Sequence, residues 1–170
     1  MTLEVKYEEI NILDVIEKSG LSPEKKAILS KSKIILFPAA FSTSHERGDF
    51  PFETPNLLKF IRVNYPEIKI DIFENSGEEK ALALHAADVI LPSLYFAIQD
   101  IAITVIGGIL SAYLYDKFKG IPDSDKNRVK TEIFIEDRDN GLTKHITYEG
   151  PVSGLENIEK ILNFENDKES

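Results

Sequence analysis

One loop of this chain gathers residue types that could carry chemistry. Residues 42–49 read STSHERGD and directly follow an apolar run, KIILFPAAF, at residues 33–41. That run has the character of a strand buried on both faces, and in open α/β sheets ligands bind beyond the carboxyl ends of the strands. An imidazole, two carboxylates, a guanidinium and hydroxyls are sufficient for an acid/base pair or a phosphate clamp. The candidate catalytic residues are His45, Glu46 and Asp49, and the candidate ligand-binding residues are Ser42, Ser44, His45 and Arg47.

A plain solvated loop is the alternative interpretation of residues 42–49, because surface loops are polar in any case. The other titratable candidates are weaker. His85 and Asp88 are spaced for a ligand pair, but no third ligand stands nearby, so a partly buried structural histidine is favoured. His145 falls on the polar side of an alternating strand and is expected to be exposed. Asp100 stands in an apolar run and needs a partner if it is buried. We predict no metal site and no cofactor.

The longest apolar stretch, residues 89–115, contains a single charge, Asp100. Its main part is expected to form a long helix over residues 93–119, while residues 89–91 could be a strand or the first turn of that helix. A helix that is apolar nearly all round is typical of a central buried helix. Small and polar residues recur on it every three or four positions, a spacing that lets another backbone approach closely. These candidate interface residues are Thr104, Gly107, Gly108, Ser111, Ala112 and Tyr115.

The remaining pattern alternates strand and helix up to about residue 120, which predicts an α/β fold with a mostly parallel sheet and flanking helices. Strands are expected at residues 3–7, 33–41 and 68–72. Helix starts are expected at Ser22-Pro23, at Thr54-Pro55 and at residue 76, the last helix running to about residue 87. Residues 120–127 read as a linker. An alternating hairpin over residues 129–148, with a turn at residues 139–141, and a helix from residue 153 follow.

These elements suggest an α/β core over residues 1–119, a ββα unit over residues 128–164 packed on that core, and a frayed tail over residues 165–170. We expect one compact domain overall, since 170 residues with 42% hydrophobic content can fill one core. The net charge of -9 argues against binding to nucleic acid or to an anionic membrane surface. There are no cysteines and no signal-peptide pattern at the start, so a cytoplasmic location is expected.

The second half of the chain resembles, in layout, the effector-associated component domains of bacterial conflict and anti-phage systems. Those domains combine a very hydrophobic helix, a two-stranded hairpin and a short terminal helix. The corresponding segments here are residues 98–118, 129–148 and 153–162. The resemblance implies a non-catalytic adaptor or accessory subunit of a defence system, and it assigns no catalytic residues. It leaves residues 1–87 unexplained.

The leading hypothesis is therefore an interaction protein that binds a protein partner or forms a homo-oligomer. The excess of apolar helix surface and the lack of a catalytic motif favour it. One alternative is a small α/β enzyme or nucleotide-binding module that uses the loop after residues 33–41. A second alternative is a membrane-associated protein anchored by residues 98–118. That alternative is disfavoured because the most apolar part, residues 101–115, is shorter than the roughly 20 residues that span a bilayer.

Overall fold

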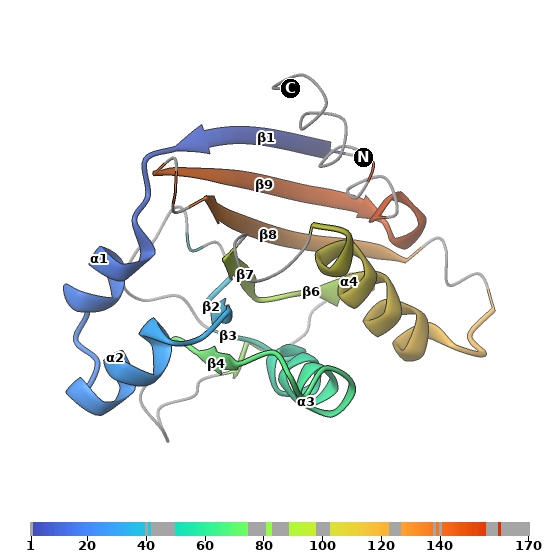
Figure 1. Cartoon of the computed structure of the whole chain (residues 1–170). Helices are drawn as coiled ribbons and strands as arrows, with labels where there is room; N and C mark the ends of the chain where they lie inside the picture. Colours follow the sequence, from blue (N-terminus) through green and yellow to red (C-terminus); the bar gives the residue numbers. More distant parts are fainter. Residues whose placement is uncertain are drawn as a thin grey trace.

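The computed structural model shows a mixed α/β fold in which one large sheet has helices on both faces (Figure 1). It describes residues 2–39, 41, 50–74, 81–82, 89–97, 103–122, 127–137, 139, 141–155 and 160. The elements in chain order are β1 (Thr2–Glu8), α1 (Ile12–Glu17), α2 (Pro23–Ser30), β2 (Ile34–Phe37), β3 (Phe50–Pro51), α3 (Thr54–Asn64), β4 (Ile70–Ile72), β5 (Ala81–Leu82), β6 (Val89–Ile90), β7 (Ser93–Ala97), α4 (Ile103–Phe118), β8 (Arg128–Asp137), β9 (Leu142–Pro151) and the 3₁₀ helix η2 (Val152–Leu155).

The large sheet has the strand order β1-β9-β8-β7-β2-β4, and β6 also pairs with β8. The pairs β7–β8, β6–β8 and β2–β4 are parallel, whereas β1–β9, β8–β9 and β2–β7 are antiparallel. The prediction of a mostly parallel sheet is therefore wrong. The reason is β7, which lies between β2 and β8 and runs antiparallel to β2. The sequence pattern assigned the residues of this one central strand to the start of the long helix.

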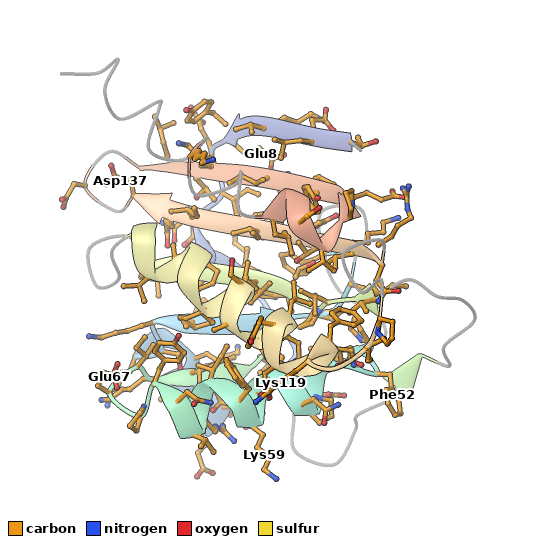
Figure 2. The ribbon with its side chains drawn as sticks, turned by 90° about the vertical axis from the view of Figure 1, so that its right-hand side faces the viewer. Glu8, Phe52, Lys59, Glu67, Lys119 and Asp137 are labelled. Carbon is orange, nitrogen blue, oxygen red and sulfur yellow. The ribbon has the colours of Figure 1, made fainter. Side chains whose placement is uncertain are left out.

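Two hydrophobic cores lie on opposite faces of this sheet because consecutive strand residues point to opposite sides. In β2, Ile34 and Leu36 belong to the core beneath α3 and α4, while Ile35 and Phe37 belong to the core beneath α1 and α2. The strands β7 and β8 alternate in the same way. Figure 2 looks onto the face that α4 and α3 cover, with β1 at the far edge of the sheet from α3.

The predicted long helix over residues 93–119 is wrong in its first part. Residues Ser93–Ala97 form strand β7 and all of them are buried, and the helix α4 that follows is 16 residues long. The run SLYFA is apolar and of strand length, and no Gly or Pro separates it from the helical residues. A continuous apolar run of this kind does not show in sequence where a buried strand ends and a buried helix begins.

The local signals for helix starts are confirmed in two places. The Ser22 hydroxyl accepts a hydrogen bond from the backbone N–H of Lys25 at 3.2 Å, with Pro23 as the first residue of α2. In α3, Pro55 likewise stands in the first turn, where its missing N–H costs nothing. The predicted helix over residues 76–87 is wrong at Ala81–Leu82, which pair as a strand with Phe50–Pro51. Its other residues lie outside the described part of the chain.

The predicted C-terminal hairpin is present as β8 and β9, and Gly141 takes a positive φ of 67° at its turn. Of the helix predicted from residue 153, residues Val152–Leu155 form the 3₁₀ helix η2. Most of the rest of it lies outside the described residues. The hairpin belongs to the same sheet as β2 and β7, because β8 pairs with β7 on one side and with β9 on the other.

A buried carboxylate joins α3 and α4, the two helices that cover one face of the sheet. Glu53, only 4% exposed, stands at the start of α3 and accepts hydrogen bonds from the Tyr113 hydroxyl and the Lys117 ammonium of α4. Burial alone would raise the pKa of Glu53, but the bonds from Lys117 and Tyr113 outweigh it and lower that pKa. Burial and the same carboxylate raise the pKa of the Tyr113 hydroxyl. The carboxylate therefore stays ionised and fixes α3 against α4.

We expect Tyr113→Phe to lower the free energy of unfolding by about 1–2 kcal/mol, because it removes one hydrogen bond to a buried charge. Urea unfolding at neutral pH measures this. Tyr115→Phe, two positions along the same helix, is the matched control: Tyr115 is 72% exposed, so its change should stay within about 0.5 kcal/mol. Equal effects at the two positions would contradict a role for the Glu53 contact in holding the helices together.

Candidate functional site

The loop that the sequence singled out lies outside the described residues, and this holds for Ser42, Ser44, His45, Glu46, Arg47 and Asp49. The same is true of His85, Asp88 and Asp100. The buried aromatic ring of Phe41 is the last described point before that loop, packed in the core beneath α1 and α2. The candidate site that the geometry does show is therefore built elsewhere, on α4.

The predicted interface stripe on α4 divides between the two sides of the helix. Gly107 is buried, whereas Gly108 is exposed, and no described heavy atom lies within 4 Å of the place where the side chain of residue 108 would begin. Ser111 and Ala112 are half-buried and Tyr115 is 72% exposed. The backbone of Thr104 is helical, and its side chain lies outside the described part. Positions 108, 111 and 115 thus form an outward face with small residues at one end and an aromatic ring at the other.

This outward face leads into a groove between the C-terminal half of α4 and the 3₁₀ helix η2, next to each other in Figure 2. The groove has a volume of about 350 Å³. Ile121, just past the helix end, is 50% exposed beside it. The residues that line it are Ser111, Leu114, Tyr115, Phe118, Lys119, Gly120, Ile121, Val152, Ser153 and Leu155.

The backbone turns away from α4 at Gly120, which takes a positive φ of 80° after the last turn of the helix. Left-handed backbone of this kind is the usual way to end a helix and is open to glycine without strain. The chain then leaves Ile121 beside the groove. On the opposite wall, β9 runs directly into η2 and delivers Val152 and Leu155. The groove therefore forms where the C-terminal end of α4 and the 3₁₀ helix η2 meet.

A second polar cluster surrounds His145 on the other face of the sheet, and here the expectation of an exposed strand residue is wrong. His145 is 6% exposed. Its Nδ1 lies 3.2 Å from the Glu8 carboxylate of β1, and its Nε2 lies 3.7 Å from the Glu132 carboxylate of β8. The Phe134 ring stacks on the imidazole at 4.5 Å between centroids. Three adjacent strands thus contribute to one charged contact.

The Glu132 carboxylate raises the pKa of His145, burial opposes this, and Glu8 raises the pKa further, so the net shift is upward. A histidine held as a cation between two carboxylates is a poor general base, because the proton it would have to lose is the one that both carboxylates stabilise. The cluster is therefore suited to fastening the edge strand β1 to β9 and β8. The sequence does not reveal it, because the contact depends on the pairing of Phe134 with His145 and of Lys6 with His145 in the sheet register.

No group of three or more histidine, aspartate or glutamate side chains among the described residues is placed to hold a metal ion. None of the described helices has the length and apolar character that crossing a membrane requires. Comparisons with protein-family models, with curated proteins and with solved structures found no match.

The His145 cluster generates a pH prediction. In the unfolded chain the pKa of His145 is close to its ordinary value of about 6.5. Because the pKa in the folded chain is higher, the added stability is fully present below about pH 6.5 and is lost as the pH rises through the folded value. We expect His145→Gln to lower the free energy of unfolding by about 2 kcal/mol at pH 6, since it leaves two carboxylates without their cation.

Urea unfolding of both proteins between pH 6 and about pH 9 measures the difference. This difference in the free energy of unfolding should shrink as the pH rises, and the titrations of groups that do not interact with His145 cancel in it. A difference that is constant or grows with pH would contradict the protonated state of His145.

Proposed function

We propose that this chain is a protein-interaction module that binds an apolar segment of a partner in the groove between α4 and η2. The observation that carries the proposal is the continuous outward surface of α4, from Gly108 to Tyr115, that opens into this groove. An aromatic ring that is 72% exposed at the rim of an apolar groove is of the kind that supplies most of the energy at protein interfaces. Small residues beside it allow close approach of a partner backbone.

The size and chemistry of the groove define its occupant. A volume of about 350 Å³ is at the lower end of small-molecule sites and accommodates a few side chains. The walls are apolar at Leu114, Phe118 and Leu155, and Lys119 is the charged residue of the lining. A helical segment with two or three apolar side chains on one face and an acidic residue beside them fits this combination.

The polar clusters of the described residues support this role over catalysis. Glu53 is engaged by Tyr113 and Lys117, and His145 is held between two carboxylates. These groups stabilise contacts between elements, and neither cluster contributes a residue to the groove. The resemblance to effector-associated component domains adds the proposal that the partner is a subunit of a bacterial defence system.

The test uses a phage-displayed library of amphipathic helical peptides, selected on the immobilised full-length chain. We expect the enriched peptides to share apolar residues at helical spacing with an adjacent acid. Tyr115→Ala should weaken their binding by about tenfold or more, as loss of an aromatic anchor does. Lys119→Glu should weaken binding of the same peptides by repulsion of their acid. Isothermal titration calorimetry with one enriched peptide measures both.

The matched control is Val63→Ala on α3. Val63 is 67% exposed and Tyr115 is 72% exposed, but Val63 does not line the groove, so its variant should bind the peptide with unchanged affinity. Failure to enrich any peptide, or peptides whose binding is the same in all these variants, would refute the groove as the binding site.

A further inference from the structure

The edge strand β1 offers a second surface, formed by other residues than the groove. It is seven residues long, pairs with β9 along one side, and is the last strand of the sheet at that edge (Figure 1). Among the described residues no strand pairs with its outer side. An extended, regular edge strand presents its outward N–H and C=O groups as a template for another strand. From the character of this strand we propose that β1 pairs antiparallel with β1 of a second copy of the chain, in the single register that places Val5 opposite Val5.

The distribution of side chains on β1 gives the first argument. Leu3 and Val5 pack against the core beneath α3 and α4, and Tyr7 stands on the same face, 55% exposed. On the opposite face stand Glu4 and Lys6, whose charged groups are 2.8 Å apart and both more than half exposed. Addition of a strand at this edge would therefore extend an apolar face on one side and a row of alternating charges on the other.

The symmetry of a dimer limits the registers that are possible. When a two-fold axis runs perpendicular to a continuous sheet, directly opposed residues must point to the same face, so the register can shift only in steps that keep this parity. With Val5 opposite Val5, Glu4 of each copy faces Lys6 of the other. Leu3 faces Tyr7, and the strand Thr2–Glu8 overlaps along its whole length.

The two neighbouring registers are unfavourable. One has Glu4 opposite Glu4, and the other has Lys6 opposite Lys6 and Glu4 opposite Glu8. Like charges that are directly opposed destabilise a strand pair, and opposite charges stabilise it by a similar amount. Both shifted registers also leave part of the strand without a partner. Charge and length thus select the same register, which is the property of a self-complementary surface rather than of a strand that merely lies at an edge.

The sheet would continue through the two copies, with Val5–Val5 and Leu3–Tyr7 contacts on one face. A strand pair of roughly 24 Å length is a small interface, so a weak dimer whose population rises with protein concentration is expected. Because Glu8 is held by His145 on the face that carries Glu4 and Lys6, the strand that would pair is fastened to the sheet in advance. This lowers the ordering cost of association.

The test uses the full chain and two exposed charge reversals, Glu4→Lys and Lys6→Glu. Each reversal alone places like charges opposite each other twice in the dimer. We expect each to weaken self-association by about tenfold or more in sedimentation equilibrium. An equimolar mixture of the two variants restores both opposed pairs, and so does the double variant carrying both reversals. Affinity-tagged Glu4→Lys chain should therefore retain untagged Lys6→Glu chain and fail to retain untagged Glu4→Lys chain.

Thermal melting followed by circular dichroism confirms that the variants fold, which is expected because both positions are exposed. Three results would overturn the proposal: a wild-type chain that stays monomeric at the highest accessible concentration, a dimer that neither reversal weakens, or single variants that fail to associate on mixing. The groove is tested separately. Tyr115→Ala should leave self-association unchanged, and Glu4→Lys should leave peptide binding unchanged, so failure of one proposal is distinguishable from failure of the other.

Discussion

The register of β8 against its two neighbours is the constraint on which the rest of the structure depends. On one side β8 pairs with β9 and on the other with β7, so it joins the C-terminal hairpin to the strands of the first half of the chain. Ile133 and Ile135 enter the core beneath α4, while Phe134 enters the opposite core. A slip by one residue would exchange these faces. It would bury the carboxylates of Glu132 and Glu136, which stand on the same face as Phe134, under α4. It would also move the Phe134 ring away from His145, so both cores and the polar cluster depend on one register.

The fold could be predicted from the sequence wherever a signal is local. The alternation in β1, the apolar run of β2, the cap at Ser22 and the hairpin turn at Gly141 each depend on residues within a few positions of one another. Strand β7 could not be predicted, because its identity as a strand comes from its partners β2 and β8. Sequence showed that these residues must be buried. It did not show against what, and burial in a sheet and burial in a helix leave the same apolar composition.

The same distinction between local signals and long-range contacts explains which features of the candidate sites could be predicted. Sequence located the small-residue face of α4, since helical spacing is local, but assigned Gly107 and Gly108 to one side of it. Only packing separates them: Gly107 is buried, and Gly108 is exposed with open space around it. The groove needs η2 to lie against α4, a contact between residues about 40 positions apart. The burial of His145 needs Glu8, which is 137 positions away. No pattern within either segment indicates such contacts.

The polar groups of the described residues act as fasteners between elements of the fold. Asp71 binds Lys25 at 2.7 Å and so fastens α2 to β4, in the way that Glu53 fastens α3 to α4 and His145 fastens β1 to β8. Each of these charges is neutralised by a partner inside the fold, and each would lose that partner if it entered a reaction. The outward face of α4 presents small and aromatic side chains, and the outer side of β1 presents backbone donors and acceptors. Apolar surface and unpaired strand edges are the features on which the two association proposals depend, because covering them with another protein surface is favourable in general.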